Sequence, residues 1–267
     1  MEIKMHLRMI KWSGLLCAVA LLGACGGQST SSETPTAALP TPLSVSTALF
    51  AEKALSANGQ LSCASCHTDD NAHADATGTL LPLGGQSMTV QGFRSSPTML
   101  YLEANKAFRF ESGQAFGGFN WDGRSNSRAE QAAGPLLDPG EMANDNVAAV
   151  AAKVRQLPYF GDFASVFGLP AAPSDAQIFE HSQTALQTYQ QKDPDYLLFN
   201  SKFDRYLDGS ATLTVQEARG LGVFNDANKG NCASCHTSQT GSQGERPLFT
   251  NFSYAALGLP RNPQIQA

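Results

Sequence analysis

Apolar residues recur along much of the chain at the three- and four-residue spacing of a helix face. Residues 146–156 carry valines at this spacing and predict a short helix with one buried side. A longer helix is predicted over residues 174–191 and a shorter one over residues 129–133. The alternation that indicates strands is scarce, whereas glycine and proline are common between the helical segments. The pattern predicts a mainly α fold with long loops.

The helical pattern leads twice into the same short motif. A helical segment with Phe50 near its end precedes CASCH at residues 63–67, and one with Phe224 near its end precedes CASCH at residues 232–236. A glycine-containing turn separates helix and motif in each copy. The second helix starts with the Thr-x-x-Glu pattern of a capping box at residues 214–217. The folded part therefore contains a weak internal repeat.

Two prolines divide the chain between the repeated motifs. Pro170 and Pro173 lie just before the long predicted helix, where a helix from the preceding segment would be interrupted. We therefore expect one domain over residues 44–170 and a second over residues 171–267. Hydrophobic residues make up 42% of the chain, enough to build a globular core.

The N-terminus has the pattern of an export signal. Basic residues precede a short apolar stretch that ends in LGAC at residues 22–25, similar to a bacterial lipobox. On this interpretation residues 1–24 are a lipoprotein signal peptide, and Cys25 carries a lipid that anchors the protein to a membrane, with the outer membrane favoured. Residues 25–43 then form a flexible Ser/Thr/Pro/Ala tether. The alternative is an ordinary secretory signal with a chance cysteine.

The two CASCH motifs predict covalent attachment of two c-type haems. The two thiols of Cys-x-x-Cys-His add to the vinyl groups of one haem, and the adjacent histidine then binds its iron. A half zinc site or a redox pair would need further ligands or a βαβ setting, and neither is visible. The attachment residues are Cys63, Cys66, Cys232 and Cys235, with His67 and His236 as proximal iron ligands.

Few side chains remain to bind the opposite face of either haem. After the signal, the other histidines are His73 and His181, and the methionines are Met88, Met99 and Met142. His73 lies only six residues beyond His67, where folding back to the opposite face of the same haem would be tight, so it is interpreted as a solvated loop residue in NAHADATG rather than a ligand. His181 is interpreted as a surface or capping residue. The formal net charge of −5, without a basic run, gives no support for binding nucleic acid.

From about residue 48 to its end, the chain resembles the bacterial dihaem cytochrome c peroxidases, which include the MauG-like enzymes. The resemblance rests on the order and spacing of several blocks. These are LSCASCH at 61–67, RSSPTML at 94–100, WDGR at 121–124, EQAAGP at 130–135, PGEM at 139–142, LTVQEARGLGVF at 213–224 and GLPRNP at 258–263. It implies two cytochrome c-like haem domains, the first peroxidatic and the second for electron transfer.

The resemblance also implies roles for three residues outside the haem motifs. Glu141 matches the distal acid/base carboxylate, and Gln131 matches the amide that orients bound peroxide. Trp121 matches the tryptophan between the two haems, a route for electrons. Taken singly, these residues would be a helix-terminal carboxylate, a surface amide and a core tryptophan.

The sequence departs from the family pattern in three places. The loop at residues 81–98 lacks the histidine that caps the first haem in many members. Either this haem is open at rest, as in the MauG-like branch, or Met88 or His73 supplies an unusual cap. The family's calcium site has an asparagine near Ser95, so Ca²⁺ binding is in doubt. The chain stops at Ala267, before the second haem's usual distal ligand, so we expect a truncated C-terminal domain.

The resemblance implies a cytochrome c peroxidase of the periplasm. Hydrogen peroxide is the substrate, and a small monohaem cytochrome c or a cupredoxin supplies electrons; the family also implies a homodimer. One alternative is a MauG-like oxidase that draws electrons from a partner protein. Another is a membrane-tethered dihaem electron carrier without enzymatic activity.

Overall fold

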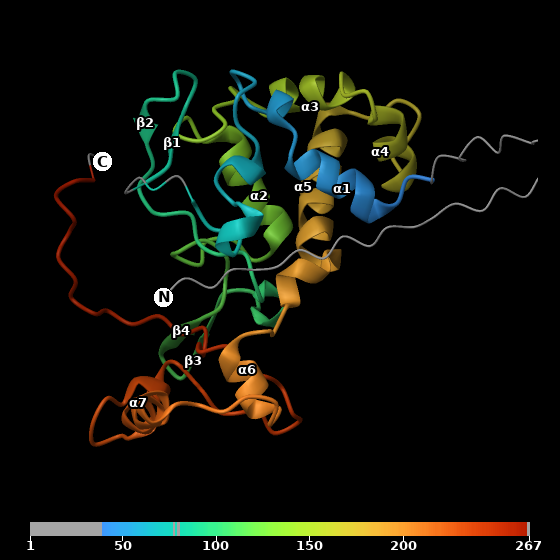
Figure 1. The fold of residues 1–267 in the computed structure, drawn as a ribbon. Coiled ribbons are helices and arrows are strands. Elements are labelled where there is room, and N and C mark those ends of the chain that lie inside the picture. Colours follow the sequence, from blue (N-terminus) through green and yellow to red (C-terminus); the bar gives the residue numbers. More distant parts are fainter. Residues whose placement is uncertain (1–38, 77, 79–80, 266–267) are drawn as a thin grey trace, which may run out of the picture. The chain divides into compact units, whose positions relative to one another are not determined.

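The computed structural model of the chain describes residues 39–76, 78 and 81–265. The predicted signal peptide, Cys25 and most of the predicted tether lie outside these residues. The fold is mainly helical, as predicted (Figure 1). The helices are α1 (Pro42–Phe50), α2 (Arg128–Leu137), α3 (Val147–Arg155), α4 (Phe160–Val166), α5 (Asp175–Lys192), α6 (Lys202–Leu207) and α7 (Val215–Asn225).

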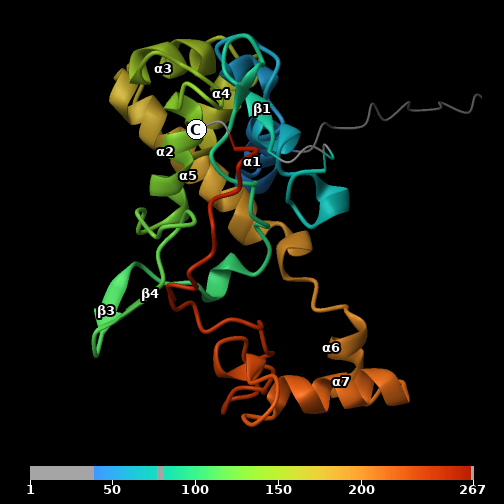
Figure 2. The same cartoon turned by 90° about the vertical axis from the view of Figure 1, so that its left-hand side faces the viewer.

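The strands form two short antiparallel hairpins. β1 (Leu83–Gly84) pairs with β2 (Val90–Gln91), and β3 (Arg109–Glu111) pairs with β4 (Gln114–Phe116). Figure 2 shows the β3–β4 hairpin extending away from the helices. Among the described residues, no helix is both long enough and apolar enough to cross a membrane.

Side-chain caps explain where several helices begin. Asn146 accepts a hydrogen bond from the N–H of Ala149 at the start of α3, and Ser174 forms a capping box with Gln177 at the start of α5. The predicted capping box at the start of α7 is present. The predictions over 146–156 and 174–191 are confirmed. α2 runs four residues past its predicted end, and α4 was not predicted.

One hydrophobic core is built around α5, which packs against α1, α2 and α3 (Figure 1). Its buried members extend from Val45 in α1 to Tyr196, just beyond α5. The valines predicted to be buried in α3 do lie in this core. The predicted boundary between residues 170 and 171 passes through the core. We therefore propose that the second haem segment begins after Tyr196.

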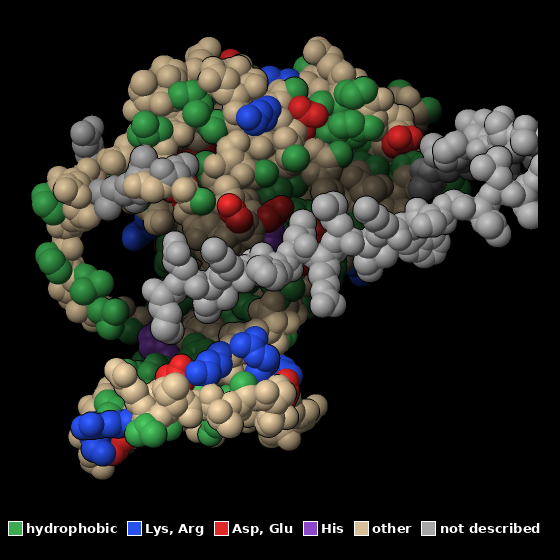
Figure 3. All heavy atoms as spheres, in the orientation of Figure 1, with side chains coloured by type: hydrophobic (Ala, Val, Ile, Leu, Met, Phe, Trp, Pro, Cys, Tyr) green, Lys and Arg blue, Asp and Glu red, His purple; other side chains and the backbone are tan. Residues whose placement is uncertain are grey.

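The segment after Tyr196 buries little apolar surface. α7 has no buried residue, and Val215 at its start is 89% exposed. Leu257 and Leu259 are also largely exposed, and Figure 3 shows hydrophobic side chains along the segment that ends the chain. The part of this segment that contains the second CASCH motif is connected by hydrogen bonds, ion pairs and a small cluster of aromatic rings.

Candidate haem-binding site

The first CASCH motif folds into a single tight turn. Cys63–Ser65 forms a 3-10 helix, and the N–H of His67 donates to the carbonyl of Cys63 at 3.0 Å. Burial raises the pKa of Cys63 to about 12 and that of Cys66 to about 11, so both thiols are neutral. Burial also lowers the pKa of His67, which favours the neutral imidazole that binds metals.

The His67 ring is held by a carbonyl six residues downstream. Its Nδ1 lies 2.8 Å from the carbonyl oxygen of His73. Because a carbonyl can only accept, Nδ1 donates the proton in this bond. Metal-binding histidines are commonly oriented in this way through their other ring nitrogen.

The second CASCH motif repeats this arrangement with a longer loop. Cys232–Ser234 forms the same 3-10 turn, and Nδ1 of His236 lies 2.8 Å from the carbonyl oxygen of Phe249. Each motif therefore presents two thiols and one imidazole whose Nδ1 is held by a backbone carbonyl. This donor set fits a covalently attached haem with histidine as its axial ligand.

His73 is not the solvated loop residue that its polar neighbours suggested. Its side chain is only 3% exposed, and its ring stacks on Tyr196 with 4.2 Å between ring centroids. Its Nδ1 lies 3.2 Å from a carboxylate oxygen of Asp69, within ion-pair range but not aligned as a hydrogen bond. The neighbours of the His73 ring are therefore the side chains of Tyr196 and Asp69. His181 lies half-buried on α5.

Glu141 lies within electrostatic reach of the first pair of thiols. Its charge contributes to the raised pKa values of both Cys63 and Cys66. Desolvation, with a further contribution from Asp138, raises the pKa of Glu141 itself to about 7, while Arg124 opposes the rise. The side chain also keeps solvent-exposed surface.

The Glu141 backbone is held from two sides. The N–H of Gly85 donates to the carbonyl of Glu141 at 2.9 Å, and the N–H of Ala57 donates to the carbonyl of Met142 at 2.7 Å. A Cβ at Gly84 would overlap the carbonyl oxygen of Gly140. The loop that lacks the family's histidine is therefore in close backbone contact with the loop that carries the candidate acid/base.

A buried polar cluster lies beneath this loop. Asn144 is 4% exposed and donates both amide hydrogens, to the carbonyls of Leu55 and Leu136, at 2.8 and 2.7 Å. The ammonium of Lys153 donates to the Asn144 side-chain oxygen and to the carbonyl of Ser56, each at 2.5 Å. The sequence analysis did not identify this cluster, because its members are far apart in the chain.

The other two predicted site residues are less constrained. Gln131 is half-buried on α2, and Pro135 cannot donate to its carbonyl. The side chain of Gln131 makes no hydrogen bond with any of the described residues. Trp121 is 54% exposed rather than in the core, and its Nε1–H donates to the carbonyl of Ser95 at 2.9 Å. Arg124 pairs with Asp122.

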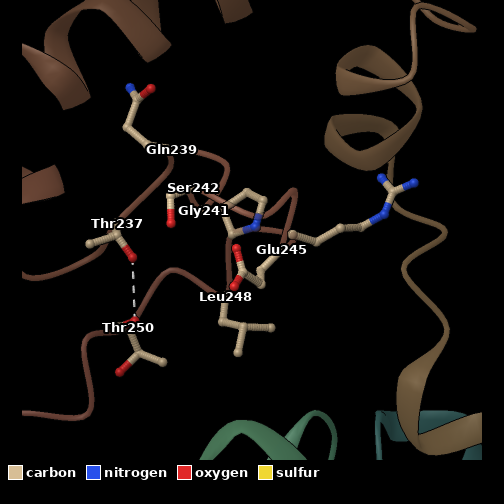
Figure 4. A pocket seen from close by; sticks show the side chains of 9 residues that line it. Thr237, Gln239, Gly241, Ser242, Glu245, Leu248 and Thr250 are labelled. Atoms are coloured by element: carbon tan, nitrogen blue, oxygen red, sulfur yellow. Dashed lines mark hydrogen bonds between the residues drawn. The ribbon is translucent and has the colours of Figure 1, made fainter.

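A shallow pocket of about 320 Å³ lies in the loop that follows His236 (Figure 4). Its lining is mostly polar, and the hydroxyl of Thr237 donates to the carbonyl of Thr250 across it at 3.3 Å. The lining contains no cysteine or histidine. In the described part of the chain, no group of three or more His, Cys, Asp or Glu could hold a metal ion, and Ca²⁺ binding stays a prediction.

Comparison with known proteins gives consistent results. The profile of the family described as di-haem cytochrome c peroxidase matches residues 44–212. The chain is 36% identical to the methylamine utilization protein MauG of Paracoccus denitrificans, over 80% of this chain and 56% of that protein. It is 31% identical to the cytochrome c551 peroxidase of Nitrosomonas europaea, over 79% of this chain and 53% of that protein.

A solved structure gives the same result for the fold. The dihaem peroxidase BthA from Burkholderia thailandensis matches with a TM-score of 0.78 and 36% identity, over 85% of this chain and 56% of that one. The chain thus spans little more than half the length of these relatives. It belongs to the di-haem cytochrome c peroxidase family, which includes both peroxidases and MauG-like proteins.

Proposed function

We propose that this protein reduces hydrogen peroxide to water at a haem held by Cys63, Cys66 and His67. Membership of the family implies covalently bound haem c. The observation that supports the proposal most directly is Glu141, a carboxylate with a pKa of about 7 beside the first pair of thiols. A pKa near the working pH suits a group that must both accept and donate a proton.

The reaction consumes hydrogen peroxide, two electrons and two protons, and yields two water molecules. The bound haem supplies the iron at which peroxide is held and reduced. Ionised Glu141 accepts a proton from one peroxide oxygen and delivers it to the other, which leaves as water. The amide of Gln131 holds the peroxide in position for this transfer.

Electrons reach this site from outside. In the proposed route, a small monohaem cytochrome c or a cupredoxin reduces the haem held by Cys232, Cys235 and His236. The indole of Trp121 would lie on the route from this motif to the haem held by Cys63, Cys66 and His67. The exposed ring of Trp121 is compatible with a position between two cofactors rather than in a protein core.

A MauG-like oxidase is the second candidate, and one observation favours it. The loop at residues 81–98 contains no histidine and packs its glycines directly against the Glu141 loop. With no histidine in this loop to cap it, a haem held by Cys63, Cys66 and His67 would react with peroxide without reductive activation. The same pair of haems would then draw electrons from a partner protein. A dihaem electron carrier would instead need both haems capped.

Spectra of the haem-loaded protein separate these functions. A high-spin component in the oxidised spectrum that shifts when peroxide is added would support an enzyme with an open first haem. Turnover of peroxide with reduced cytochrome c then distinguishes the peroxidase from the oxidase. A fully low-spin spectrum that ignores peroxide, even after one-electron reduction, would contradict both and support the carrier.

We also propose that the protein works in the periplasm, anchored by a lipid on Cys25. The export signal and the haem motifs support this location. Labelling with a radioactive fatty acid tests the anchor. Label that is incorporated into the wild type and lost in Cys25→Ser would support it, whereas an unlabelled wild type would contradict it.

A further inference from the structure

The carbonyl groups that hold the two motif histidines belong to residues with strained backbones. His73 has φ 52° and Phe249 has φ 55°, in the left-handed region that residues with a side chain seldom adopt. In each case the N–H of this residue donates to the carbonyl of the threonine that follows the motif. The His73 bond to Thr68 measures 3.0 Å and the Phe249 bond to Thr237 measures 3.2 Å.

Two hydrogen bonds and a strained residue therefore make the same closed loop at both motifs, which we call the histidine clasp. Strain of this kind persists only where the surroundings hold the residue in place. The side chains of His73 and Phe249 are the groups that could do so, because each is an aromatic ring packed against other rings.

At the first clasp, the His73 ring lies flat on Tyr196, with an angle of 12° between the ring planes. Tyr196 is itself only 2% exposed and lies in the core around α5. Its carbonyl accepts a hydrogen bond from the N–H of Tyr101 at 2.9 Å, and its ring meets Tyr189 edge-on at 5.3 Å. Tyr196 is therefore a rigid platform for His73.

At the second clasp, the anchor is apolar and more open. The Phe249 ring meets Phe203 at 5.2 Å and Phe224 at 5.9 Å, both edge-on, and Phe249 is 37% exposed. In the same loop, the guanidinium of Arg246 donates two hydrogen bonds to the carboxylate of Asp208, directly after α6, at 2.8 and 2.9 Å. The two clasps thus share their backbone geometry but use separate anchors.

We propose that the stack of His73 on Tyr196 is a brace that orients the His67 imidazole and so sets the reduction potential of the first haem. A firm hydrogen bond from Nδ1 makes the ligand more basic, which favours the ferric state. Nδ1 of the His73 ring also lies 3.2 Å from a carboxylate oxygen of Asp69. Both His73 and Tyr196 are positioning residues, and the inference rests on the proposed attachment of haem at His67.

The test is carried out on the haem-loaded protein with two variants that remove the brace differently. Tyr196→Leu removes the platform. His73→Gly removes the ring, and because glycine adopts the left-handed conformation without strain, any loosening of the backbone carbonyl comes from loss of the stack. Tyr196→Phe is the matched control, because it keeps the ring face on which His73 lies. The second haem is an internal reference in every variant.

Two readouts are independent of turnover. Spectroelectrochemical titration gives the potential of each haem, and hyperfine-shifted NMR follows solvent exchange of the Nδ1 proton of each axial histidine. In Tyr196→Leu and His73→Gly we expect less of the first haem to be ferric. At a fixed potential, its ferric-to-ferrous ratio should fall on the order of tenfold. That change equals about 59 mV for one electron. Exchange of the His67 Nδ1 proton should accelerate.

The expected pattern also includes an unchanged second haem and an unchanged Tyr196→Phe variant. The brace is refuted if His73→Gly carries two haems and leaves both the first potential and the proton exchange as in the wild type. This variant decides the matter even where Tyr196→Leu fails to fold. A haemochrome assay showing fewer than two haems in the wild type would contradict the proposed attachment, not the brace.

Discussion

Gly85 donates its backbone N–H to the carbonyl oxygen of Glu141 at 2.9 Å. This bond joins the loop that departs from the family pattern to the residue proposed to move protons. The neighbouring Gly84 lies so close to the Glu141 loop that a Cβ there would overlap the carbonyl of Gly140. The position of the carboxylate therefore depends on two small residues that take no part in the chemistry.

Gly84→Ala should displace the Glu141 loop. Overpacking of this kind costs about 1–3 kcal/mol of stability. A displacement near 1 Å can reduce activity by roughly 10²-fold. Steady-state peroxidase assays and urea denaturation measure the two effects. Gly134→Ala is the matched control, since nothing lies within 4 Å of a Cβ at this position of α2. Equal activity in the two variants would show that the glycine contact does not position Glu141.

The reaction with peroxide should depend on pH through Glu141. Its pKa is raised to about 7, so the carboxylate is mostly protonated below that pH and cannot accept a proton from peroxide. The second-order rate with peroxide should therefore rise with an inflection near pH 7. Stopped-flow measurements from pH 5 to pH 9 record it.

Glu141→Gln should lower this rate by about 10²–10⁴-fold and abolish the inflection. Glu180→Gln, on the exposed side of α5, should change neither. If the inflection persists in Glu141→Gln, a group other than Glu141 causes it.

Lys153→Met should destabilise the fold beneath the Glu141 loop. Without the ammonium, the side-chain oxygen of Asn144 loses its donor, and the carbonyl of Ser56 keeps only the N–H of Gly59. Leaving such groups unsatisfied costs about 1–3 kcal/mol. Urea denaturation compares this variant with Lys53→Met, which changes an exposed lysine. Equal midpoints for the two variants would contradict a structural role for the Lys153–Asn144 pair.

Trp121→Phe should slow electron transfer between the haems and leave the fold intact. Because the indole is 54% exposed and has one hydrogen bond, to Ser95, stability should change by only about 0.5 kcal/mol. Rapid-mixing spectroscopy should show slower oxidation of the second haem by peroxide, with binding of peroxide unchanged. Phe110→Leu, an exposed ring on the β3–β4 hairpin, serves as the control. An unaltered rate in Trp121→Phe would remove the indole from the route.

Local sequence patterns were sufficient for several of the helices but not for their packing. The valine spacing in α3 and the capping box of α7 act within one turn of helix, and both appear in the structure. Pro170 and Pro173 do interrupt the chain before α5. Local periodicity does not encode whether α5 packs with the elements before or after this break. The contacts of α5 with α1, α2 and α3 place it with the elements before the break.

The same limit applies to the site. The CASCH spacing identifies the thiols and the imidazoles, because all of them fall within five consecutive residues. The acceptor for each histidine lies six residues downstream in one copy and thirteen in the other, so no common spacing reveals it. His73 looked solvated because its sequence neighbours are polar, whereas the ring that buries it comes from Tyr196, far along the chain.

The separation between His73 and Tyr196 also orders the assembly of the two motifs. A chain made from its N-terminus exposes the first CASCH long before the ring that completes its clasp has been synthesised. Phe203, in contrast, precedes the second CASCH, so one anchor of that clasp already exists when His236 emerges. The first clasp can therefore be completed only after residue 196 has been made, whereas the second is complete once Phe249 follows its motif.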